Sequence, residues 1–290
     1  MQGLDHSRPL TNAMKWMLLA ASILVFLAGI QLFILTENTD RYFAWTVDPP
    51  LTAAALGGAY CASSVLELGA SRQPTWARAR IALPAVLVFT TLIFVTTLLH
   101  LDRFHLGNGF PATTQFVTWL WIAVYAVVPV LMSILLVHQL RAAGVDEPRR
   151  NPLPPWLRAV LGLHAVVLLT LGFALFVAPS MTMSLWPWML TPLTARTVGA
   201  WLLSLGLAAA HANAENDWGR VTVATQTYVL LGILEFVALI RYPSSVDWAR
   251  PAAAIYVLFL ASVLLVGIYG WVTTRRIAHR SIGGLGGRRI

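Results

Sequence analysis

Long apolar runs dominate the pattern of hydrophobic and polar positions along the chain. Eight runs of bilayer-spanning length lie near residues 16–36, 51–69, 81–100, 115–138, 157–178, 194–211, 221–241 and 252–273. A helix needs about 20 predominantly apolar residues to cross the hydrocarbon core. The pattern therefore predicts an all-α integral membrane protein with about eight transmembrane helices.

The composition supports this interpretation. The chain has 290 residues, of which 58% are hydrophobic and only 11% charged, and its mean hydropathy is +0.70. Soluble domains carry about 25% charged residues, so the excess of apolar side chains must face lipid. The first run is too long for the core of a signal peptide, and we expect it to be an uncleaved span.

The charges between the runs predict an orientation. If the N-terminus is cytoplasmic, 15 of the 20 Lys and Arg residues fall on the cytoplasmic side. By the positive-inside rule, both termini are then cytoplasmic, in an inner or plasma membrane of the bacterial type. The basic residues form no stripe with interleaved aromatic residues, so the net charge of +8 does not indicate a nucleic-acid partner.

The chain matches itself at an offset of 142 residues. The matched residues are Pro50-Leu51-Thr52-Ala53 with Pro192-Leu193-Thr194-Ala195, Gly57 with Gly199, Trp76 with Trp218, Arg78 with Arg220, and Phe94-Val95 with Phe236-Val237. An apolar bias alone does not align Pro, Trp and Arg. We therefore expect two tandem four-helix repeats, which insert in parallel because each has an even number of spans.

The match divides the chain into four parts. We expect a first repeat at 1–140, including a cytoplasmic N-terminal tail, and a second repeat at 157–274. A polar, proline-rich cytoplasmic linker at 141–156 joins them, and a disordered basic cytoplasmic tail occupies 275–290.

Small residues distinguish the second and sixth spans, which are rich in Ala, Gly and Ser. Such residues let helix backbones approach closely, so these two spans are predicted to lie inside the bundle. Spans one, five and eight are rich in Leu, Val and Ile and are better suited to face lipid. Cys61, the single cysteine, fits a small core residue in a tight helix contact.

A ligand site is predicted near the outer starts of the second and sixth spans, between the two repeats. In one interpretation, the proline in the first turn and the nearby threonine simply give both spans a good helix start. In the other, the N-termini of the two helices point into one shared outer cavity and favour an anion there. Tryptophans beside these starts either anchor the protein in headgroups or form a lid. The candidate ligand contacts are Thr52, Thr194, Trp45, Trp188, Arg196 and Glu235.

Glu235 is the strongest of these candidates because an ionisable group inside a membrane is costly. Arg196 is its expected partner. Two roles for Glu235 remain open. It could form a buried ion pair with Arg196 that locks two helices together, or it could be a carboxylate that couples to protons or substrate. Glu67 lies near the cytoplasmic end of the second span and is expected to reach water or an arginine such as Arg72.

Histidines raise the alternative of a metal or haem. His100, Asp102 and His105 could bind a divalent metal, although Arg103 lies between them. His138, His164 and His211 could ligate a haem if two of them faced each other. A solvated turn and ordinary packed histidines are the competing interpretations, and no cofactor is predicted on balance.

Three functions remain open. The first is a binding or transport module for a small or lipid-like molecule. The second is a non-catalytic accessory or structural subunit associated with other membrane subunits, and the third is a haem- or metal-binding redox protein. The sequence contains no phosphate loop, zinc-protease motif or Cys-x-x-Cys pair, which argues against an enzyme.

Overall fold

The computed structural model describes residues 7–286 and places eight long helices there. They are α1 (Asn12–Ile34), α3 (Pro50–Ser71), α5 (Ala82–Leu99), α6 (Ala112–Leu140), α7 (Pro155–Val177), α9 (Pro192–Glu215), α10 (Trp218–Arg241) and α11 (Pro251–Gly286). All eight are long and apolar enough to cross a membrane. The prediction of an all-α chain with eight helices of bilayer-spanning length is confirmed for the described residues.

Short helical turns join the long helices. They are α2 (Thr39–Tyr42), α4 (Trp76–Ala79), α8 (Pro179–Thr182) and the 3₁₀ turns η1 (Thr36–Asn38), η2 (Leu101–Arg103), η3 (Met183–Leu185) and η4 (Pro243–Ser245). Within residues 7–286 the only β pairing is three isolated bridges. As predicted, Pro50 and Pro192 each occupy the first turn of a long helix.

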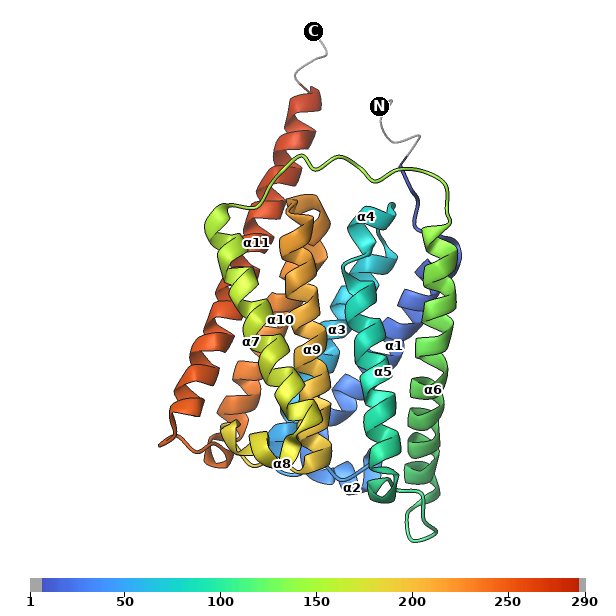
Figure 1. The fold of residues 1–290 in the computed structure, drawn as a ribbon, viewed down its shortest axis with the longest axis vertical. Helices are drawn as coiled ribbons and strands as arrows, with labels where there is room; N and C mark the ends of the chain where they lie inside the picture. The colour runs from blue at the N-terminus through green and yellow to red at the C-terminus, as the bar shows by residue number, and fades with distance from the viewer. Residues whose placement is uncertain (1–6, 287–290) are drawn as a thin grey trace.

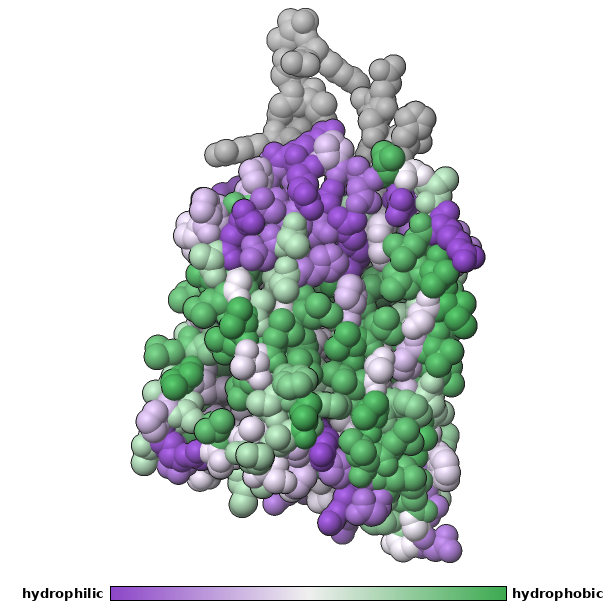
Figure 2. Space-filling model, viewed as in Figure 1, coloured by the Kyte–Doolittle hydropathy of each residue, from purple (hydrophilic) through white to green (hydrophobic). Residues whose placement is uncertain are grey.

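The helices form a bundle whose long axis runs along the helices (Figure 1). The connector between α6 and α7 crosses one end, which we call the connector end. The turns α2 and α8 lie at the opposite end, called the α8 end. In the space-filling view, hydrophilic side chains gather at the connector end while apolar side chains cover the middle of the bundle (Figure 2). This distribution fits a protein surrounded by lipid.

The buried fraction of each helix largely follows its composition, with the small-residue helices the most buried. The most apolar windows of α3 and α9 are 83% and 67% buried, against 28–33% for α1, α7 and α11. The interior position of spans two and six is thus confirmed, and spans one, five and eight are exposed on the outside of the bundle. The most exposed helix is α6, at 17%, which the sequence did not single out.

Glycines set the closest helix contacts. A Cβ atom on Gly57 would lie 2.9 Å from the carbonyl oxygen of Gly29, so α1 and α3 touch through their backbones. A Cβ atom on Gly199 would lie 2.8 Å from the carbonyl oxygen of Gly172, where α7 meets α9. Cys61 lies in the first of these contacts, beside Gly29, as its predicted role as a small core residue requires.

Each small-residue helix also packs against a helix of the other half. Besides the pairs α1 with α3 and α7 with α9, the main contacts are α3 with α10 and α9 with α5. The pairs α5 with α6 and α10 with α11 complete the bundle. The two halves of the chain are therefore interleaved rather than set side by side.

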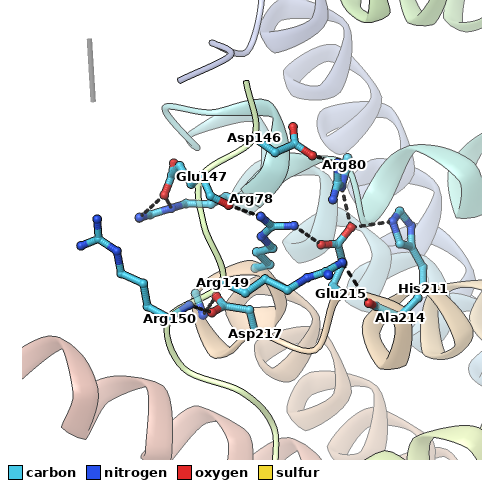
Figure 3. A network of polar contacts seen from close by, with 12 residues as sticks. Arg78, Arg80, Asp146, Glu147, Arg149, Arg150, His211, Ala214, Glu215 and Asp217 are labelled. Carbon is cyan, nitrogen blue, oxygen red and sulfur yellow. Dashed lines mark hydrogen bonds and ion pairs between the residues drawn. The ribbon is translucent and has the colours of Figure 1, made fainter. Parts of the chain in front are cut away.

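A polar network binds the connector to both halves (Figure 3). Arg80 donates hydrogen bonds to Asp146 of the connector and to Glu215 at the end of α9. Arg220 donates to Glu215 at 2.6 Å and to the backbone carbonyl of Glu147. The connector is thereby held against the last residue of α9 and the first turn of α10.

The end of α11 differs from the prediction. The segment 275–290 was expected to be disordered, but the helix continues to Gly286. The residues that follow Arg275 include Arg, Ile, Ala and His, which a helix tolerates, and the first paired glycines come only at Gly283 and Gly284. Residues 287–290 of that segment lie outside the described part of the chain.

Candidate ligand-binding site

A cavity of about 500 Å³ lies in the half of the bundle nearer the α8 end. Its walls come from the first half of α3, the last part of α7, the middle of α9, the last part of α10 and the first part of α11. The segment 185–188, which follows α8, closes it toward the α8 end. Both halves of the chain therefore contribute to its lining.

The cavity opens between α7 and α11. These helices touch nearer the connector end, where the rings of Trp156 and Tyr269 are 5.0 Å apart and His164 hydrogen-bonds Ser262 at 2.9 Å. Toward the α8 end they diverge (Figure 1). Val167 of α7 and Ile255 of α11 line the cavity and are also exposed on the apolar outer surface. The opening is therefore lateral and faces the region that lipid would occupy.

Six aromatic side chains form much of the wall: Trp186, Trp188, Trp201, Tyr228, Tyr256 and Phe259. The rings of Trp186, Trp188 and Tyr256 pack against one another at 5.1–5.4 Å. Trp188 donates its indole N–H to Thr52 at 2.9 Å, which joins the second half of the chain to the start of α3. This bond fixes the closing segment over the cavity.

Three of the five polar atoms of these rings are covered by neighbouring atoms. The indole nitrogens of Trp186 and Trp201 and the hydroxyl of Tyr228 are covered and lack a hydrogen-bond partner in the described structure. Because those atoms are covered, the ring carbons form the wall. The cavity is therefore predominantly apolar, and its aromatic carbons present π-electron density rather than hydrogen-bond donors.

Glu235 is the one acidic residue among the lining residues of this cavity. Its side chain is only 6% exposed. Its sole hydrogen bond among the described residues comes from the Tyr256 hydroxyl, which donates to Oε2 at 2.9 Å. Oε1 lies beside Gly58 of α3, where the missing side chain leaves room for it. Oε1 thus has no hydrogen-bond partner within residues 7–286.

The expected pair of Glu235 with Arg196 does not form. Arg196 instead donates a hydrogen bond to Nε2 of His100 at 2.7 Å. The reason is the packing of α9 against α5, which brings Arg196 to the end of α5 and away from α10. Burial and the Arg196 charge together lower the pKa of the His100 imidazole.

Three of the six predicted ligand contacts line the cavity, namely Thr52, Trp188 and Glu235. Trp45, Thr194 and Arg196 do not line it. Thr194 forms a capping box with Thr191, the N-cap of α9. The cavity therefore includes the start of α3 but not the start of α9, and two helix N-termini do not share it.

Trp45 lies in a separate aromatic cluster. Its ring is 2% exposed and packs against Phe43, Phe104 and Trp121 at 4.7–5.2 Å. Trp186 and Trp188 are equally buried. The prediction that these tryptophans anchor the protein in lipid headgroups is therefore wrong, because their rings are buried in the protein.

The predicted metal ligands are not assembled. His105 is buried and contacts the carbonyl oxygen of Phe43 at 2.9 Å and the Thr46 hydroxyl at 3.1 Å. Asp102 is exposed and pairs with Arg103, while His100 faces Arg196. Phe104 inserts into the aromatic cluster and separates the three side chains. The described residues contain no group of three or more His, Cys, Asp or Glu placed to hold a metal.

The three histidines considered for haem have unrelated surroundings. His138 is exposed on α6, His164 bonds Ser262, and His211 donates to Glu215 at 3.2 Å. The three lie on three different helices, and the partners of His164 and His211 differ. The arrangement gives no support to a haem site.

Glu67 is buried, contrary to expectation. It is 1% exposed and accepts a hydrogen bond from Ser63 at 3.2 Å, while its Oε2 atom has no partner among the described residues. It does not reach Arg72, because α3 is enclosed by neighbouring helices along most of its length. Glu67 is also absent from the cavity wall.

Sequence reasoning missed Trp201, Tyr228 and Tyr256 as site residues. A single aromatic residue in an apolar helix resembles any core residue, so only the fold shows that these three converge. Comparison of the chain with protein-family models, curated proteins and solved structures finds no match. The functional argument therefore depends on the cavity itself.

Proposed function

We propose that this protein is a membrane binding or carrier module that takes a lipid-like molecule into the cavity from the surrounding bilayer. The observation that carries the proposal is an apolar cavity of about 500 Å³ that opens between α7 and α11. Ligand pockets commonly measure about 300–1,000 Å³ and combine apolar walls with a few polar groups. Thr52, Glu235 and Arg250 supply such groups here.

The proposed tandem duplication is consistent with this role. The Gly29–Gly57 contact between α1 and α3 has a counterpart in the Gly172–Gly199 contact between α7 and α9. The contact of α3 with α10 likewise has a counterpart in the contact of α9 with α5. Two parallel copies around one axis would place a site where they meet.

The second copy would be the specialised one. At the proposed offset, Ile93 occupies the position that matches Glu235. The first half fills its aromatic interior, where Trp121 contacts Trp45 at 4.9 Å and Tyr125 at 4.4 Å. One half would then serve as a packed scaffold while the other holds the ligand.

The proposal is tested by filling the cavity. Ala252 of α11 lines it, whereas Ala254 on the same turn is exposed to the outside. We expect Ala252→Phe to abolish co-purification of lipid-like molecules, measured by native mass spectrometry, and their stabilisation of the protein against heat. Ala254→Phe is the matched control and should behave as wild type. Equal ligand retention by both variants would exclude this cavity as the site.

A further inference from the structure

We infer that the ligand is a lipophilic cation, an ammonium group carrying apolar substituents, whose charge is balanced by Glu235. The inference rests on the proposed function, because it names the chemistry of the molecule in the same cavity. It is carried by three features of the wall: one carboxyl group without a cationic partner, a set of aromatic rings, and a lateral opening to lipid.

Glu235 supplies the charge. The acidic residues that form ion pairs in the described structure are Asp40, Asp102, Asp146, Glu147 and Glu215, and Glu235 is not among them. A carboxylate buried without a counter-ion is strongly unfavourable, so the group holds a proton instead. A cation that enters the cavity and meets Oε1 stabilises the ionised form and takes the place of that proton. A neutral hydrocarbon does not, and an anion is repelled by the ionised form.

The aromatic wall favours the same ligand. A cation is attracted to the face of Trp, Tyr or Phe within about 6 Å of the ring centre, and cages of such rings recognise quaternary ammonium groups. Trp186, Trp188 and Tyr256 lie together on one side, and Tyr256 also holds Oε2 of Glu235. The carboxyl group and the rings can therefore act on one charged centre.

Arg250 is the one basic residue among the lining residues, and it lies in the part of the cavity nearest the α8 end, which the segment 185–188 closes. Its guanidinium donates to the carbonyl oxygens of Trp186 and Ser184. Glu235 lies six residues before Arg241, the last residue of α10. It is therefore about 9 Å farther from the α8 end along the helix axis than Arg241 is. The two charges thus occupy different depths, and a cation that enters laterally from lipid avoids Arg250.

Binding of matched probes tests the inference. The full chain is held in an uncharged maltoside detergent, which contains no ammonium group, and binding of decyltrimethylammonium, decanol and decanoate is measured by equilibrium dialysis against matched empty micelles. We expect the cation to bind wild type at least about tenfold more tightly than decanol, since one well-placed charge interaction is worth that factor, with decanoate weakest. This comparison needs no variant to fold.

Two carboxyl variants localise the effect. Glu235→Gln should weaken cation binding about tenfold or more and leave decanol within about twofold. Glu67→Gln is the matched control, because Glu67 is equally buried but absent from the cavity wall, and it should keep the cation preference.

The failures are distinguishable. If all three probes bind equally, and equally after Glu235→Gln, the inference is overturned while the proposed binding function stands. If no probe binds and Ala252→Phe retains the same lipids as wild type, the proposed function itself fails.

Discussion

Glu215 shows how much a single residue can hold together at the connector end. Its carboxylate accepts hydrogen bonds from Arg80, Arg220 and His211, and its side chain is 4% exposed. Arg80 belongs to the first half of the chain, while Arg220 belongs to the second. A buried acid with several cationic donors contributes less than its Coulomb energy suggests, but removing it leaves buried positive charge unpaired.

We expect Glu215→Gln to lower the free energy of unfolding by about 3 kcal/mol, because Arg220 would remain buried without its ion-pair partner. The measurement is thermal or denaturant unfolding of the protein in mild detergent. Asp102→Asn is the control, since Asp102 and Arg103 form an exposed pair worth about 1 kcal/mol or less. A loss for Glu215→Gln no larger than that of Asp102→Asn would show that the network does not stabilise the fold.

For single residues, the sequence indicated which side chains belong to the candidate site better than it indicated which side chains they contact. The costs of burying charge made Glu235 the leading candidate, and it does line the cavity. Its partner could not be predicted, because a helical arginine can face any of several neighbours and only the packing of α9 on α5 decides that Arg196 meets His100. Trp201 and Tyr228 carried no local signal that distinguishes a cavity wall from a filled core.

Among the elements, the helix pair α7–α9 depends on backbone contact at Gly199. A side chain there would strike the carbonyl oxygen of Gly172 and the backbone of Phe176. We expect Gly199→Val to destabilise the protein by at least about 1–3 kcal/mol, because the helices must separate to admit it. Gly162→Ala is the control, since its Cβ would meet only the flexible Asn213 side chain at 3.4 Å. Unfolding in detergent measures both, and equal stabilities would contradict the contact.

The connector is an element whose stability should depend on pH. Burial opposes the charge of Glu147, but hydrogen bonds from Thr75 and Arg78 and the positive charge of Arg78 and Arg220 outweigh it and lower the pKa. A carboxyl whose folded pKa is lowered stabilises the folded state fully above its ordinary value of 4.5. That contribution is lost as the pH falls through the lowered folded pKa.

We therefore expect wild type to be more stable than Glu147→Gln at neutral pH, by about 1 kcal/mol or less because Arg78 is partly exposed. The difference should shrink as the pH falls below 4.5, which melting temperatures of both proteins from pH 7 to pH 3 would measure. A difference that stays constant over this range would show that the Glu147 charge does not hold the connector.

The long elements were predictable because membrane-spanning length and composition are local properties. Each of the eight runs became one long helix, and the small-residue spans became the buried ones. The divergence of α7 and α11 was not predictable, since it depends on contacts such as Trp156–Tyr269 that join residues far apart in sequence. The lateral opening of the cavity lies where these two helices diverge.

For the whole molecule, the interleaving of the halves implies that neither half folds without the other. The buried faces of α3 and α9 are covered by α10 and α5 of the opposite half. Separating the halves would expose the Ala, Gly and Ser surfaces of α3 and α9 and would open the cavity wall between α3 and α10. The predicted repeats would then be units of sequence and of ancestry, but not units of stability.

Cleavage of the connector distinguishes these alternatives. A protease site inserted after Gly144, an exposed residue near the start of the connector, cuts the chain without removing a helix. We expect the two fragments to remain associated in size-exclusion chromatography and to keep binding the same lipid-like molecules. The fragments expressed separately should each aggregate, since the contacts of α3 with α10 and of α9 with α5 would be missing. Two soluble, folded half-molecules would instead show that each repeat carries its own core, and the cavity would then belong to a weak interface rather than to the fold.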